Sequence, residues 1–85
     1  MGYTVDLAPA ARRELQRLPT SVVQRVIAAL RGLQNNARPH DSVKLEGSET
    51  TYRIRVGPYR VIYEVDEHAR SVLITRIRHR KDAYQ

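Results

Sequence analysis

Residues 51–63 read Thr-Tyr-Arg-Ile-Arg-Val-Gly-Pro-Tyr-Arg-Val-Ile-Tyr, and this pattern constrains the fold more than any other part of the chain. Polar and apolar residues alternate along both halves of the segment, which is typical of half-buried strands. Glycine suits the first central position of a two-residue type II′ turn, and proline is tolerated at the second. The pattern therefore predicts a β-hairpin with Gly57-Pro58 at its tip.

A two-residue turn also fixes which residues of the hairpin face each other. One face pairs apolar residues, namely Tyr52 with Tyr63, Ile54 with Val61, and Val56 with Tyr59. The other face places Arg53 opposite Ile62 and Arg55 opposite Arg60. Like charges directly opposed across strands destabilise a sheet, so a chain that keeps them is a candidate for anion binding. Arginines that simply point into solvent are the alternative interpretation.

The rest of the chain predicts a strand over residues 3–7, helices over 10–18 and 20–34, and strands over 42–45 and 71–77. Pro9 suits the first turn of the first helix, Pro19 ends it, and Thr20 or Ser21 can cap the second. The order β-α-α-β-β-β-β predicts one α+β domain covering residues 1–85. We expect a small antiparallel sheet, mixed at its edge, with the N-terminal helical hairpin packed on one face. The tyrosines of the hairpin then meet the helices, and the arginines look away.

The charge of the chain is strongly basic, with a formal net charge of +6 and 13 arginines against two lysines. Residues 51–85 hold eight basic and four acidic side chains, and residues 76–81 contain no acid. A basic stripe on a small domain is typical of a protein with a polyanionic partner, and the arginine fork suits phosphate. A basic segment that merely keeps the protein soluble is the alternative.

Several classes of protein are disfavoured by what the sequence lacks. It has no cysteine, no apolar run near the roughly 20 residues that span a membrane, and no signal-peptide pattern. His40, His68 and His79 are scattered without metal-ligand spacing, and no glycine-rich phosphate loop is present. We therefore expect a cytoplasmic protein that needs no membrane, metal or cofactor.

The candidate site consists of cations and a tyrosine. Arg53, Arg55 and Arg60 share one face of the hairpin, and the segment after the last strand can bring Arg80 and Tyr84 beside it. Fixed cations stabilise the charge of a phosphoryl transition state, and a base can stack on tyrosine. The 2′-OH of RNA can serve as the internal nucleophile. Further candidates for RNA binding are Lys44, Arg76, Arg78, His79 and Lys81.

Nearly the whole chain resembles the RelE branch of the RelE/ParE toxin superfamily. The resemblance rests on Lys44-Leu45-Glu46-Gly47, on residues 52–63 and on His79-Arg80-Lys81-Asp82-Ala83-Tyr84. It implies a type II toxin that enters the ribosomal A site and cuts mRNA through the 2′-OH without a metal. It also implies a cognate antitoxin, whose flexible segment folds onto the toxin in a hetero-oligomer.

The resemblance further implies a role for each matched residue. Arg53 and Arg55 stand where the family has two basic strand residues, often lysines. Arg60 matches the arginine that stabilises the transition state, and Arg80 matches one proposed as general acid or phosphate ligand. Tyr84 matches the tyrosine that stacks on a base. Because arginine holds its proton far more tightly than lysine, Arg53 suits an electrostatic clamp better than a general base.

Other functions stay open at this point. Histidine is the side-chain type suited to proton transfer near neutrality, so His79 is a candidate catalytic group. The alternative is that His79 simply faces solvent. A ParE-like toxin that inhibits DNA gyrase would share the fold, because a fold does not determine function. A non-catalytic RNA-binding or complex-forming module is a third candidate, which Arg53 in place of lysine keeps open. The basic residues together with Tyr84 favour the endoribonuclease.

Overall fold

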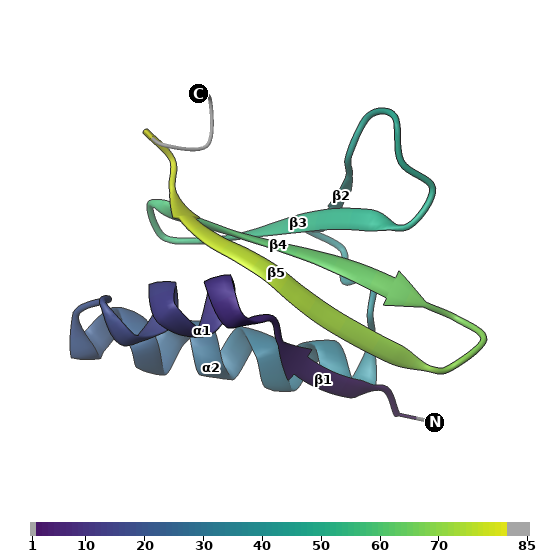
Figure 1. Cartoon of the computed structure of the whole chain (residues 1–85), viewed down its shortest axis with the longest axis horizontal. Coiled ribbons are helices and arrows are strands. Elements are labelled where there is room, and N and C mark those ends of the chain that lie inside the picture. Colours follow the sequence, from purple (N-terminus) through teal and green to yellow (C-terminus); the bar gives the residue numbers. More distant parts are fainter. Residues whose placement is uncertain (1, 82–85) are drawn as a thin grey trace.

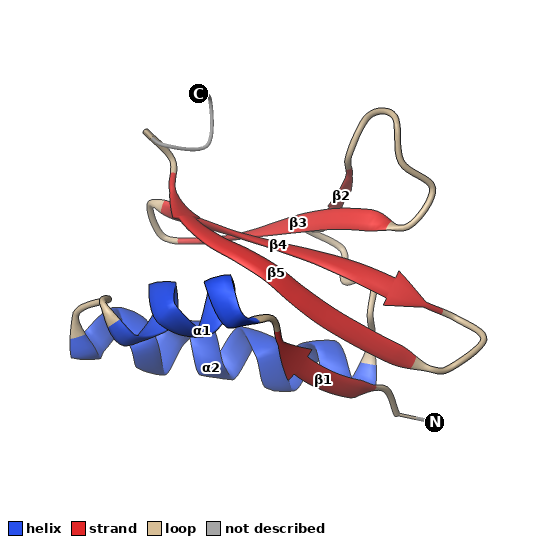
Figure 2. Ribbon diagram, viewed as in Figure 1, coloured by secondary structure: helices blue, strands red, loops and turns tan. Residues whose placement is uncertain are grey.

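The computed structural model describes residues 2–81 of the 85-residue chain. Two helices lie against one side of a five-stranded sheet, and the described part of the chain places no helix on the other side (Figures 1 and 2). The strands stand side by side in the order β1-β5-β4-β3-β2. The predicted α+β architecture, with the helical hairpin packed on one face of the sheet, is confirmed.

The two helices are α1 (Pro9–Gln16) and α2 (Thr20–Asn35). Their bounds agree with the prediction to within about two residues at each end, the usual uncertainty of helix termini. The predicted cap of α2 was wrong, because neither Thr20 nor Ser21 caps the helix through its side chain. The N-cap position is instead taken by Pro19, whose backbone carbonyl accepts the first hydrogen bonds of the helix.

The strands are β1 (Thr4–Leu7), β2 (Val43–Lys44), β3 (Thr51–Val56), β4 (Tyr59–Asp66) and β5 (Ser71–His79). β1 runs parallel to β5, and the other neighbours are antiparallel, so the sheet is mixed at its edge as expected. β5 continues two residues beyond its predicted end, because the backbone of β4 offers it partners as far as its first residue.

The hairpin of β3 and β4 has the predicted register along its whole length. Val56 pairs with Tyr59 across the two-residue turn. Gly57 has a φ of +59°, the sign that a type II′ turn needs at its first central position. A Cβ at this position would lie 3.0 Å from Nη1 of Arg25, a side chain on α2. Glycine is therefore favoured here both by its backbone conformation and by its close neighbour.

Gly57→Ala is expected to lower the free energy of unfolding by about 1–2 kcal/mol, since L-residues are strained at positive φ. The Arg25 side chain can move aside, so the backbone accounts for most of the effect. Urea denaturation followed by circular dichroism measures it. Gly32→Ala on α2 is the control, because nothing lies within 4 Å of the added Cβ and alanine favours helix. Equal stability of the two variants would contradict the strained turn.

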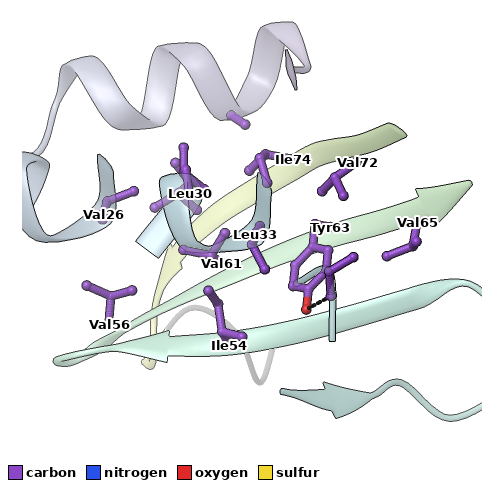
Figure 3. Packing of buried hydrophobic residues seen from close by; sticks show 13 residues of the cluster. Val26, Leu30, Leu33, Ile54, Val56, Val61, Tyr63, Val65, Val72 and Ile74 are labelled. Atoms are coloured by element: carbon purple, nitrogen blue, oxygen red, sulfur yellow. Dashed lines mark hydrogen bonds between the residues drawn. The ribbon is translucent and has the colours of Figure 1, made fainter. Parts of the chain in front are cut away.

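The core fills the space between the helices and the sheet (Figure 3). Tyr63 lies at its centre with no exposed surface, and its hydroxyl donates a hydrogen bond of 2.9 Å to the carbonyl of Ala37. The ring stacks on Tyr52 with 5.9 Å between centroids. Burial raises the pKa of Tyr63 to about 12. The tyrosine-bearing face of the hairpin thus meets the helices, which leaves the arginines on the opposite face.

Candidate functional site

Arg55, Arg60 and Arg78 form a row across three neighbouring strands, which we call the arginine row. Arg60 on β4 pairs directly with Arg55 on β3 and with Arg78 on β5. Because side chains alternate in direction along a strand, the row lies on the sheet face that points away from the helices. Arg60 is 8% exposed, Arg78 is half-buried and Arg55 is exposed. Three like charges in register do not favour folding, so the row points to a function.

Two more arginines extend this surface in the next row of the same face. Arg53 on β3 pairs with Ile62, and Ile62 pairs with Arg76 on β5. We use the name arginine face for all five side chains: Arg53, Arg55, Arg60, Arg76 and Arg78. The predicted sharing of one face by Arg53, Arg55 and Arg60 follows directly from the register. The position of Arg78 beside Arg60 was not predicted, because β5 was expected to end at residue 77.

A carboxylate from the helical layer reaches the edge of the arginine face. Glu14 on α1 accepts hydrogen bonds from Nη2 and Nε of Arg76, at 2.8 and 3.1 Å. Its other oxygen accepts the backbone N–H of Ile77 at 2.7 Å. Oε2 also lies 4.0 Å from Nε of Arg78. β1 stops pairing with β5 at Leu7, and α1 lies against the remainder of that edge.

The electrostatics of Glu14 follow from these contacts. Partial burial acts to raise the pKa of its carboxyl group. The hydrogen bonds from Arg76 and Ile77, together with the charges of Arg76 and Arg78, outweigh burial and lower the pKa. Glu14 is therefore ionised at neutral pH and reduces the positive charge at this edge. Sequence reasoning did not select Glu14, which is 62 residues distant from Arg76.

Two residues predicted to bind RNA are not part of the arginine face. Lys44 on β2 lies opposite Tyr52, and its Nζ is 3.1 Å from Oε2 of Glu49. His79 lies opposite Tyr59 and meets that ring edge-on, with 5.2 Å between centroids. Since both tyrosines belong to the helix-facing rows, alternation places Lys44 and His79 on the opposite side of the sheet from the arginine row.

The segment after β5 turns beside the tip of the hairpin. The backbone N–H of Arg80 donates a hydrogen bond of 2.8 Å to the carbonyl of Pro58. Lys81 is exposed, and its backbone N–H donates to Nδ1 of His79 at 3.2 Å. Arg80 thus follows the strand that carries Arg78 and lies near the start of β4. Tyr84, the predicted stacking residue, lies outside the described residues.

Four acidic side chains line a hollow at the far end of β4, away from the hairpin turn. The hollow of about 490 Å³ is lined by Glu49, Glu64, Asp66 and Glu67, with Arg38 as the basic residue of its described lining. These acids have basic neighbours of their own, because Glu67 pairs with Arg38 and Arg70, and Glu49 pairs with Lys44. The hollow is therefore a surface of mixed charge.

Two features are absent from residues 2–81, the part of the chain that the structure describes. No group of three or more histidine, aspartate and glutamate side chains is placed to hold a metal ion. Neither helix is long and apolar enough to cross a membrane.

Comparison with known proteins identifies the family. Residues 5–84 match the model of a family described as the ParE toxin of the type II toxin–antitoxin system parDE. The chain belongs to the RelE/ParE toxin superfamily. The resemblance that the sequence predicted is therefore confirmed.

Individual relatives place this RelE/ParE protein in the RelE-like branch. It is 31% identical over 88 residues to RelE1 of Methanocaldococcus jannaschii, covering 100% of the chain and 98% of RelE1. It is 32% identical over 87 residues to toxin RelG of Mycobacterium tuberculosis, covering 100% and 99%. A chain of the RelE–RelB complex from Pyrococcus horikoshii has a TM-score of 0.85 and 32% identity, with coverage of 94% and 97%. The chain is a RelE-like toxin of a type II toxin–antitoxin system.

Proposed function

We propose that this toxin is a ribosome-dependent endoribonuclease that cuts mRNA in the A site and so inhibits translation. The arginine row carries the proposal, because it fixes Arg60 between Arg55 and Arg78 on a sheet face that the helices leave uncovered. Guanidinium groups bind phosphate oxygens through paired hydrogen bonds. Five of them on one face are suited to hold an RNA backbone at its scissile phosphodiester.

In the proposed reaction the 2′-OH gives its proton to a water molecule and its oxygen attacks the adjacent phosphorus. The bond to the 5′-oxygen breaks, and that oxygen takes up a proton from Arg80 or from water. Negative charge builds up on the phosphoryl oxygens in the transition state. Arg60 stabilises this charge effectively because it is nearly buried, and a low local dielectric strengthens the interaction. Arg53 and Arg55 clamp the backbone, Arg80 is the phosphate ligand or proton donor, and Tyr84 stacks on a base.

An antitoxin is the second partner in the proposal. The relative from Pyrococcus horikoshii was crystallised as a RelE–RelB complex, in which RelE is paired with RelB. A cognate antitoxin that forms a hetero-oligomer with this chain would keep RNA from the arginine face. The proposed partners are therefore the ribosome with its mRNA and this antitoxin.

The test is translation of a defined mRNA by purified ribosomes, followed by mapping of the mRNA 5′ ends. We expect new ends inside the A-site codon when both toxin and ribosomes are present, and none with toxin alone. Arrested translation with intact mRNA would overturn the proposal. Since the matched family model carries the ParE name, inhibition of gyrase supercoiling is the parallel assay, and a positive result there would favour a ParE-like toxin.

A further inference from the structure

Glu14 binds the arginine face in the way that a phosphate would. One carboxylate oxygen accepts both N–H groups of the Arg76 fork and lies 4.0 Å from Nε of Arg78. Planar, charge-assisted hydrogen bonds of this kind are the ones that arginine also makes to phosphate oxygens. Because the Glu14 carboxylate already occupies the paired Nε and Nη2 donors of Arg76, an RNA phosphate must displace it to use that pair.

We propose that Glu14 is an internal competitor for RNA, a positioning residue that keeps Arg76 at the edge of β5 and weakens RNA binding while it stabilises the fold. The inference rests on the proposed function, since it takes the arginine face as the RNA site. It concerns the strength of binding and not the chemical step. The contact comes from α1 and therefore couples the helical layer to the RNA-binding side of the sheet.

Charge and exposure both support competition. The five arginines carry a formal charge of +5, and Glu14 reduces the local sum to +4. The Glu14 side chain is 21% exposed and that of Arg76 is 44% exposed, so RNA can reach the ion pair from solvent. The lowered pKa of the Glu14 carboxyl keeps its charge at neutral pH. A permanent anion among cations lowers phosphate affinity at every physiological pH.

The stabilising half of the proposal follows from the same contacts. Glu14 satisfies the backbone N–H of Ile77, which has no strand partner on that side because β1 has ended. It also offsets repulsion between Arg76 and Arg78. Glutamine at position 14 keeps an oxygen for Ile77 but loses the charge. Glu14→Gln is therefore expected to lower the melting temperature by about 2–5 °C, as loss of a partly exposed ion pair does in a small domain.

The binding experiment titrates the full-length protein against a fluorescent single-stranded RNA of about 12 nucleotides at several salt concentrations, read by anisotropy. Glu14→Gln is expected to bind about threefold more tightly at roughly 0.1 M salt, with a salt slope steeper by about 0.7, as one added phosphate contact on single-stranded RNA predicts. Asp6→Asn is the matched control, because it makes the same charge change at an exposed position on β1. Its salt slope should equal that of the wild type.

Arg76→Gln supplies a second, independent measurement. Because Arg76 is already engaged by Glu14, its loss should change RNA affinity by less than about twofold. When Glu14→Gln is added to the Arg76→Gln variant, the gain in RNA affinity should be much smaller than the gain that Glu14→Gln produces alone. If Glu14 only supported the fold, Glu14→Gln would lower the melting temperature but would not produce these differences in RNA affinity.

Two results separate failure of this inference from failure of the proposed function. If Arg55→Gln weakens RNA binding but Glu14→Gln leaves affinity and salt slope unchanged, or weakens binding, the competitor role is overturned and the RNA site stands. If Arg55→Gln leaves RNA binding unchanged, the arginine face is not the RNA site and both proposals fall. A large loss of affinity in Arg76→Gln would also overturn the competitor role, and this outcome does not depend on how well Glu14→Gln folds.

Discussion

Arg60→Ala is expected to reduce mRNA cleavage on the ribosome by about 100- to 1,000-fold, the usual effect of removing one fixed donor from a charged transition state. Arg60 is 8% exposed and lies on a strand with a neighbouring strand on each side, so its side chain has little freedom to move before RNA binds. A mobile surface arginine would contribute less, because part of its interaction would be lost in ordering it. Single-turnover cleavage of mRNA on programmed ribosomes measures the rate.

The same variant separates catalysis from binding. We expect its RNA affinity to fall by less than about tenfold, as for one phosphate contact among several. Its stability should change little, since relief of like-charge repulsion offsets the lost packing. Arg13→Ala, at an exposed position on α1, is the matched control and should cleave like the wild type. Parallel loss of cleavage and affinity in Arg60→Ala would instead identify a non-catalytic RNA-binding module.

Tyr63→Ala is expected to lower the free energy of unfolding by about 3–5 kcal/mol, as for other aromatic side chains removed from a core. The side chain has no exposed surface, bonds the carbonyl of Ala37 and stacks on Tyr52. A domain of this size has a total stability of about 5–15 kcal/mol, so a large unfolded population is expected. Urea denaturation measures the change. A loss below about 1 kcal/mol would show that the core repacks around the missing ring.

The hydroxyl of Tyr63 adds an alkaline limit to stability. Burial raises its pKa from 10.0 to about 12, so the fold favours the neutral phenol. This contribution is complete below pH 10 and is lost as the pH rises from about 10 toward 12. Tyr63→Phe removes that part of the pH dependence and costs about 1–2 kcal/mol at neutral pH, because the Ala37 carbonyl loses its donor. Denaturation curves of both proteins across this pH window test the assignment.

The hairpin could be predicted from the sequence because its signals are local. Gly57-Pro58 sets the turn, and the turn sets the pairing of Arg55 with Arg60. The pairing of Arg60 with Arg78 was missed, because a run of basic residues lacks the apolar alternation by which a strand is recognised. There, the neighbouring backbone of β4 decided the conformation.

Contacts between residues that are far apart in the chain could not be predicted from the sequence. Glu14 belongs to a helix whose polar positions look alike in sequence, and no spacing rule joins it to Arg76. Their meeting depends on where β1 ends and on how α1 then lies along β5. The residues proposed to bind phosphate were thus accessible from pattern and family resemblance, whereas the residue proposed to oppose them required the three-dimensional structure.

The place of β5 in the sheet has a consequence for when the arginine face forms during synthesis of the chain. Among the described strands this one comes last in the chain, yet it lies between the first strand and β4. A growing polypeptide that has not yet released residues 71–79 lacks Arg76 and Arg78, and its N-terminal strand has no neighbour to pair with. The arginine face is therefore complete only after β5 has left the ribosome and has paired with both β1 and β4.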